Sequence, residues 1–189
     1  MSQQQRTDIT LFAMVALVAM SRLIPHWPNF TPVMAVALVG GSLFASKLRS
    51  VAIPLAAMVL SDIALGAVFG FGYALHSTQL VVYSMVIALS LFGSAIRSWR
   101  PAALAFGGGS ISAIAFFLVT NFAVWFSDGM YPLTLEGLIA CYGAGLAFYR
   151  DGGNFFLNGL VSTWLFSGLL LGAASLVRTA RSNPSVSAR

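Results

Sequence analysis

Three long stretches of the chain contain no Asp, Glu, Lys or Arg residue. They cover residues 63–96, 101–127 and 152–177. A helix needs about 20 apolar residues to cross the hydrocarbon core of a bilayer, and each stretch is long enough. Charged residues make up only 8% of the 189-residue chain, whereas about a quarter is usual in soluble domains. The sequence therefore predicts an integral membrane protein.

Prolines and basic residues divide the apolar sequence into six expected membrane-spanning helices. Pro25 and Pro28 interrupt helical hydrogen bonding between the first helix and the second. We expect residues 1–180 to form a single all-α transmembrane domain and residues 181–189 to form a disordered cytoplasmic tail. The expected helices cover about residues 9–24, 32–45, 51–71, 79–96, 102–126 and 155–177.

The positions of the basic residues predict the orientation. With six spans and a cytoplasmic N-terminus, eight of the ten Lys and Arg residues are cytoplasmic, and only Arg22 and Arg150 are on the outer side. A seventh crossing at residues 134–149, which include Glu136, would divide them five against five. We therefore expect a six-helix bundle with both termini cytoplasmic and a short extra outer helix at 134–149, between the fifth and sixth spans.

The polar and aromatic residues that membrane packing does not require collect at the outer side. A small-molecule site is mostly apolar with a few fixed polar groups, and this clustering predicts one. The candidate substrate-binding residues are Arg22, His26, Asn29, Asp62, His76, Asn121, Trp125, Tyr131, Tyr142 and Asn154.

Asp62 is the deepest acidic residue in the expected bundle. It lies about 16 Å along the third expected helix, near the middle of the hydrocarbon, at 1.5 Å per residue. A carboxylate at this depth is costly unless it is paired, protonated or facing a wet cavity. Two interpretations stay open: Asp62 belongs to a functional site, or it is a structural partner of a group such as Arg22.

Structural roles also stay open for several other candidates. Trp125 and Tyr131 fit an interfacial aromatic belt, and a lone loop histidine such as His26 is often only solvated. Cys141 is the single cysteine, which excludes an intrachain disulfide and favours an inert buried thiol. Small residues repeat every fourth position, which predicts close helix packing within the bundle or against a partner. These residues are Ala37, Gly41 and Ala45, and then Gly168 and Gly172.

Several classes of function lack their sequence signals. No P-loop is present, because the glycine run at residues 107–109 is not followed by Lys and Ser or Thr. No His and Cys spacing predicts a metal site, and no basic run stands beside aromatic residues as nucleic-acid binding requires. We expect no enzymatic activity, no cofactor and no nucleic-acid partner. An intramembrane enzyme would require His26, His76 and Asp62 to converge.

Several sequence strings resemble a known family. They are RLIPHWPNFTPVMAVALVGGSLF from residue 22, PLAAMVLSDIALG from residue 54, the H-x-T of residues 76–78, VTNFAVW from residue 119, and YPLT with GLIACY from residue 131. This pattern is similar to a family of small bacterial membrane proteins grouped as transport proteins of unknown function. The resemblance extends from Arg22 to about Gly168.

That family is in turn similar to the substrate-binding S components of energy-coupling-factor (ECF) vitamin transporters. The resemblance implies six helices, cytoplasmic termini, a first outer loop that covers the site, and a short outer helix leading through Gly153 and Asn154 into the last span. Biotin recognition is not implied, because Leu157 stands where biotin S components carry Lys. The alanines of the first helix are spaced by three, unlike the Ala-x-x-x-Ala face by which many S components contact their transmembrane partner.

The leading expectation is a multi-pass protein of the bacterial inner membrane that captures a vitamin or vitamin precursor in an outward-facing cavity. Its partners would be the small-molecule substrate and membrane lipid. ECF-type transmembrane and ATPase subunits would supply energy, or the protein would act alone as a facilitator. The alternative is a membrane assembly or interaction factor without a small-molecule substrate, whose outer aromatic loops are contact surfaces.

Overall fold

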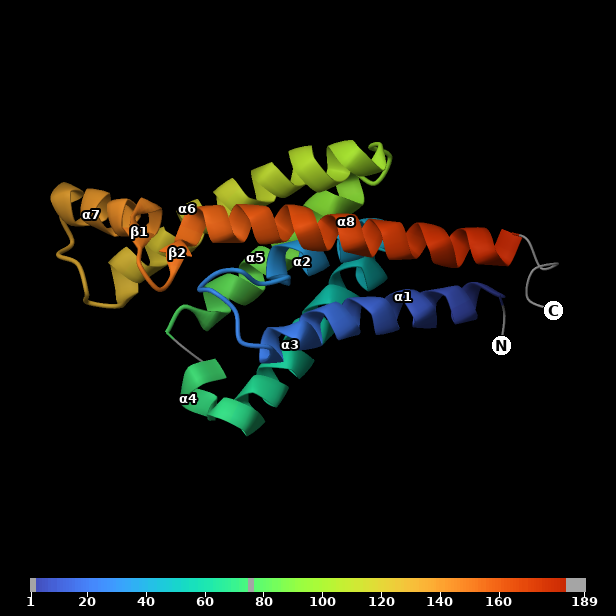
Figure 1. Ribbon diagram of the computed structural model, residues 1–189, viewed down its shortest axis with the longest axis horizontal. Coiled ribbons are helices and arrows are strands. Elements are labelled where there is room, and N and C mark those ends of the chain that lie inside the picture. Colours follow the sequence, from blue (N-terminus) through green and yellow to red (C-terminus); the bar gives the residue numbers. More distant parts are fainter. Residues whose placement is uncertain (1–2, 75–76, 183–189) are drawn as a thin grey trace.

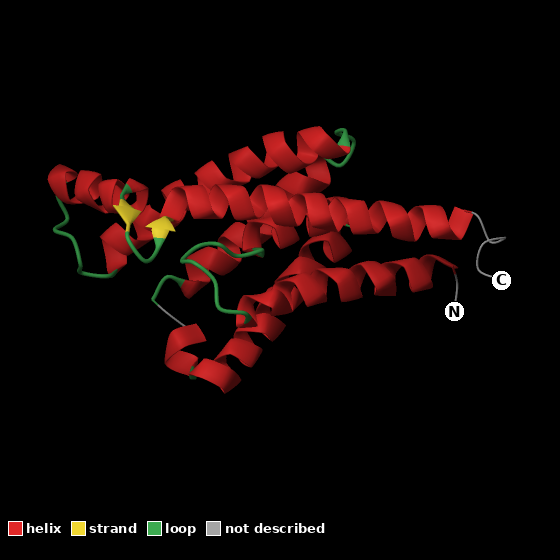
Figure 2. Cartoon of the chain, in the orientation of Figure 1, coloured by secondary structure: helices red, strands yellow, loops and turns green. Residues whose placement is uncertain are grey.

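The computed structural model describes residues 3–74 and 77–182, and almost all of this chain is helical (Figures 1 and 2). The expected all-α class is confirmed. A two-stranded antiparallel hairpin is the exception, with Phe148 paired to Asn154 and Tyr149 to Gly153. The elements in chain order are α1 (Gln3–Met20), η1 (Ser21–Leu23), α2 (Val33–Leu43), α3 (Lys47–Phe69), α4 (Phe71–Ala74), α5 (Gln79–Ala95), η2 (Ala103–Gly108), α6 (Gly109–Ser127), α7 (Leu135–Leu146), β1 (Phe148–Tyr149), β2 (Gly153–Asn154) and α8 (Phe155–Ser182).

In the described part of the chain, three helices are long and apolar enough to cross a membrane. They are α3, the continuous helix Ala103–Ser127 formed by η2 and α6, and the part of α8 from Phe155 to Val177. The helices α2, α5 and α7 are apolar but shorter. The first two turns of α1 carry several polar and charged residues, Gln3 to Arg6 and Asp8 among them.

The observed boundaries differ from the expected ones at several points. The first helix begins at Gln3 and changes to the 3-10 segment η1 at Ser21, ahead of the two prolines. The helix expected at 134–149 is shorter, because β1 follows it. The fifth expected helix begins as the π-helical segment η2, which includes two glycines of the 107–109 run. Helix α8 continues to Ser182, so residues 181 and 182 of the expected tail are helical, and residues 183–189 lie outside the described chain.

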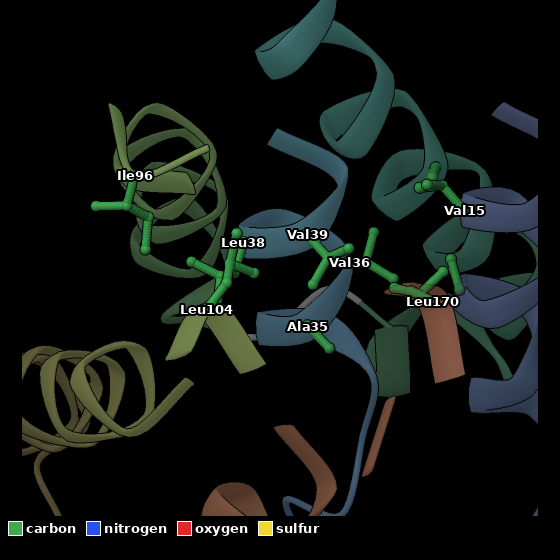
Figure 3. Packing of buried hydrophobic residues seen from close by; sticks show 10 residues of the cluster. Val15, Ala35, Val36, Leu38, Val39, Ile96, Leu104 and Leu170 are labelled. Carbon is green, nitrogen blue, oxygen red and sulfur yellow. The ribbon is translucent and has the colours of Figure 1, made fainter. Parts of the chain in front are cut away.

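Helix α2 forms the centre of the bundle. All nine residues from Val33 to Gly41 are buried, and α2 packs against α1, α3, α5, α6 and α8. Figure 3 shows Val36 and Val39 of α2 beside Val15 of α1 and Leu170 of α8, and Leu38 of α2 beside Leu104 of η2. A uniformly apolar helix with buried sides all round is typical of a core element. The other helices are therefore positioned by their contacts with α2.

Two glycines bring the backbones of α2 and α5 into direct contact. A Cβ atom on Gly41 would lie 2.2 Å from the carbonyl oxygen of Ser90, and one on Gly93 would lie 1.9 Å from the carbonyl oxygen of Leu38. Both distances are far inside van der Waals contact, so only glycine fits at either position. Small residues permit this close approach of helices in membrane proteins. The repeat that includes Gly41 therefore serves packing within the bundle.

We predict that Gly93→Ala strongly destabilises the protein. The added methyl group collides with rigid backbone rather than with a side chain, and overpacking of this kind costs about 1–3 kcal/mol or more. The matched control is Gly168→Ala on α8, where an added Cβ would meet nothing within 4 Å. It should leave stability unchanged or raise it by up to about 1 kcal/mol, because Ala favours helix more than Gly.

The melting temperature in mild detergent checks this prediction. Cys141 is only 2% exposed, so a thiol-reactive dye reports unfolding when it gains access to this single cysteine. Equal melting temperatures for the two variants would contradict the proposed backbone contact.

Candidate functional site

A cavity of about 830 Å³ lies where η1, the loop 24–32, and the facing ends of α5, α6, α7 and α8 meet. These elements lie together at the end of the bundle opposite the two termini (Figure 1). The volume is within the range of about 300–1,000 Å³ that is typical of small-molecule sites. The cavity is therefore the candidate functional site.

The cavity is lined mainly by apolar and aromatic side chains. Met34 of α2, Leu65 of α3 and Ala113 of α6 are buried lining residues. Phe117 and Phe156 also line it, with ring centroids 5.2 Å apart in an edge-to-face arrangement. Such a surface accommodates a flat apolar group by contact with ring faces and edges.

Asp62 is the centre of a buried polar network that joins three helices. Its Oδ1 atom accepts a hydrogen bond from Arg22 Nη1 at 2.6 Å, which is also an ion pair. Its Oδ2 atom accepts from Gln79 Nε2 at 2.6 Å and from Tyr83 Oη at 2.7 Å. Arg22 Nη1 also donates to Ser61 Oγ at 2.7 Å. The carboxylate is 2% exposed, and its partners satisfy both of its oxygens.

The loop 24–32 is held over the bundle by Asn158 of α8. The Asn158 amide donates to the carbonyl oxygen of Pro28 at 2.9 Å and to that of Gly152 at 2.7 Å. Gly152 lies in the β1–β2 turn, and the next residue, Gly153, has φ +64°, which favours glycine. One buried amide thus joins the loop 24–32, the hairpin and α8.

Helix α7 packs along the outer part of α6 through small residues. A Cβ atom on Gly145 would lie 2.6 Å from the ring of Phe117, and the thiol of Cys141 donates to the carbonyl oxygen of Asn121 at 3.3 Å. The Thr134 hydroxyl caps the N-terminus of α7 by accepting from the N–H of Gly137. This packing places Cys141 and Gly145 on the cavity wall.

The mouth of the cavity carries further polar groups. The Ser77 hydroxyl donates to Asp128 Oδ1 at 2.7 Å, which links the segment just before α5 to the C-cap of α6. Burial raises the pKa of the Tyr131 phenol, and the neighbouring Cys141 and Tyr149 raise it further. The Tyr131 hydroxyl therefore stays protonated at neutral pH and remains a hydrogen-bond donor.

Half of the ten predicted site residues line the cavity. They are Arg22, His26, Asn29, Asn121 and Tyr131. Asp62 lies outside the lining, because Arg22, Gln79 and Tyr83 occupy its carboxylate; it forms the structural pair with Arg22 that was one of its two interpretations. His76 lies outside the described residues.

The polar atoms of three other predicted residues form hydrogen bonds with the backbone. Trp125 Nε1 donates to Pro132 O at 2.9 Å, and Tyr142 Oη donates to Leu118 O at 2.7 Å. Asn154 caps α8, because its Oδ1 accepts from the N–H of Leu157 at 2.9 Å. None of the three is among the residues that line the cavity. These side chains shape the surroundings of the cavity.

Gln79, Tyr83 and Asn158 have structural roles that the sequence reasoning missed. Gln79 and Tyr83 are four residues apart, a spacing that places both side chains on one helix face, where they meet Asp62. Asn158 is a polar residue one turn into an apolar helix, and polar groups inside membrane helices often have specific partners. In the described part of the chain, no group of three His, Cys, Asp or Glu side chains could hold a metal ion.

Comparison with known proteins shows a family match over nearly the whole chain. The sequence family described as "Family of unknown function (DUF6580)" matches residues 2–186. No curated protein and no solved structure matches the chain.

We predict that Asp62→Ala destabilises the protein more than removal of both charges does. The single substitution leaves the Arg22 guanidinium, whose side chain is 15% exposed, without its counter-charge, and breaking a buried pair costs about 3–5 kcal/mol. The double variant Arg22→Gln with Asp62→Asn removes both charges and keeps similar shapes, so its melting temperature should lie above that of Asp62→Ala. If the double variant lost as much stability as the single variants Arg22→Gln and Asp62→Asn lose when added together, the two groups would act independently.

Proposed function

We propose that this protein, which belongs to the DUF6580 family of unknown function, binds a vitamin-sized micronutrient in its cavity as a multi-pass protein of the bacterial inner membrane. The cavity itself carries the proposal. Its volume of about 830 Å³, its apolar and aromatic lining, and the polar groups at one end are what a small amphipathic molecule requires. A cavity that served only packing would be filled by side chains, because interiors are close-packed.

The proposed topology has six spans, α1, α2, α3, α5, the η2–α6 helix and α8, with α7 as an outer helix. Both termini lie at the end of the bundle away from the cavity (Figure 1), and the basic residues of the 96–100 connection and of the start of α3 belong to that end. Basic residues favour the cytoplasmic side. Helix α2 has only 11 residues, and its neighbours shield it from lipid.

With this orientation, the cavity opens toward the outside and the loop 24–32 covers it. The arrangement agrees with the S-component resemblance, in which a first outer loop covers the substrate. Uptake would then use ECF-type transmembrane and ATPase subunits, or the protein would act alone as a facilitator. The protein itself contributes binding and no chemical step.

Native mass spectrometry of the detergent-purified protein tests the binding proposal. We expect a co-purified molecule of vitamin size on the wild type. Val82→Trp, at a cavity-lining position of α5, should abolish it because the larger side chain fills the space. Ile87→Trp is the matched control on the same helix, since Ile87 is 37% exposed and does not line the cavity; it should keep the ligand. A wild type that carries only lipid would favour an assembly factor.

Labelling of single cysteines in intact cells tests the orientation. In a Cys141→Ala background, Leu133→Cys, exposed near the cavity, should react with a membrane-impermeant maleimide. Ser98→Cys, exposed in the loop between α5 and η2, should react only after the cells are lysed. The reverse pattern would overturn the proposed topology.

A further inference from the structure

The Arg22 guanidinium uses only one of its nitrogens in the polar network. A guanidinium carries five N–H donors in a planar fork. Among the described residues, every hydrogen bond of this side chain runs from Nη1, to Asp62, Ser61 and the sulfur of Met58. The Nε and Nη2 atoms have no protein partner in that part of the chain. Arg22 also lines the cavity, so a bound molecule can reach these donors.

The remaining Nε and Nη2 donors form a parallel pair. This edge of a guanidinium matches the two oxygens of a carboxylate, and the resulting bidentate contact is among the stronger hydrogen-bonding arrangements in proteins. The Arg22 side chain is 15% exposed, and its Nε and Nη2 atoms are not sealed in the interior, so an acceptor in the cavity can reach them. The geometry therefore favours an acceptor with two oxygens in the cavity.

The negative charge of Asp62 is stabilised by other groups besides Arg22. Its second oxygen, Oδ2, accepts from two neutral donors, Gln79 Nε2 and Tyr83 Oη. Neutral hydrogen-bond donors stabilise a carboxylate without adding positive charge. Part of the attraction of the guanidinium therefore remains available to a second anionic group on its open edge. Gln79 and Tyr83 act here as positioning residues, because they hold Asp62 on the Nη1 side.

The charged group at the mouth of the cavity affects the choice between an anionic and a neutral ligand less strongly than Arg22 does. Asp128 lines the cavity, and one of its oxygens accepts from Ser77. Its surroundings are exposed, where solvent screens its repulsion of an anion. Arg22 is the only Lys or Arg among the lining residues of the described chain. An anionic group is therefore expected at Arg22 and an apolar body against Met34, Phe117 and Phe156.

We infer that the ligand is an amphipathic carboxylate: its carboxylate binds the Nε and Nη2 edge of Arg22, and its ring-sized apolar body fills the aromatic part of the cavity. This inference rests on the proposed binding function and specifies its substrate class. The Asp62 network then serves to fix the guanidinium, so that its open edge is presented to the cavity before the ligand binds.

The test compares two probes of the same shape, 2-naphthylacetate and 2-naphthylacetamide. Isothermal titration calorimetry of the full-length protein in detergent, corrected with a micelle blank, measures both affinities. We expect the carboxylate to bind at least about tenfold more tightly than the amide, because charged hydrogen bonds contribute more than neutral ones. The preference should fall to about twofold or less in the Arg22→Gln/Asp62→Asn variant, which keeps the site neutral.

Two further variants complete the test. Arg150→Gln removes a positive charge from the exposed β1–β2 turn, outside the cavity, and should keep the tenfold preference. Arg22→Lys keeps the charge but lacks the planar fork, so the preference for the carboxylate should fall severalfold. If the double variant does not fold, Arg22→Lys alone tests the role of the guanidinium.

The outcomes separate this inference from the proposed function. Equal binding of the two probes, abolished by Val82→Trp, would overturn the carboxylate inference and leave cavity binding intact. A carboxylate preference that survives in both Arg22 variants would overturn the role of Arg22. Absence of binding for both probes, together with a wild type that carries no co-purified molecule, would overturn both proposals.

Discussion

The direct backbone contact between α2 and α5 is the interaction on which the rest of the structure depends. Gly41 and Gly93 allow it, because any side chain at either position would overlap the carbonyl oxygen of Ser90 or Leu38. Once the two helices lie this close, α2 is enclosed on all sides and the remaining helices pack around it. Apolar side chains alone would not define this arrangement, since lipid is as apolar as they are, and close packing selects it instead.

The end of the bundle that holds the cavity is organised by polar groups instead. Arg22, Asp62 and Gln79 connect η1, α3 and α5. Asn158 joins the loop 24–32, the hairpin and α8. Both sets lie at the end where the helices diverge enough to leave a cavity. Hydrogen bonds thus hold open, in defined geometry, a space that apolar packing would tend to close.

The sequence predicts the helical class, and half of the candidate residues that it indicates line the cavity, but it does not predict which way each side chain faces. Uncharged stretches indicate helices whatever their neighbours are. Facing depends on the rotation of each helix, which its neighbours decide: Gly41 and Gly168 belong to similar small-residue repeats, yet only Gly41 touches another helix. Position along a helix matters as well: Asn121 lines the cavity, whereas Trp125, one turn further along the same face of α6, donates to Pro132 O.

The pairing of Arg22 with Asp62 also constrains how the chain enters the membrane. The two residues are 40 positions apart in the sequence, so Arg22 is synthesised before its partner carboxylate. An unpaired guanidinium is costly in the hydrocarbon. In the proposed six-span topology, the first helix would therefore reach its final depth only once α3 has arrived, and the segment from α1 to α3 would insert as one cooperative unit rather than helix by helix.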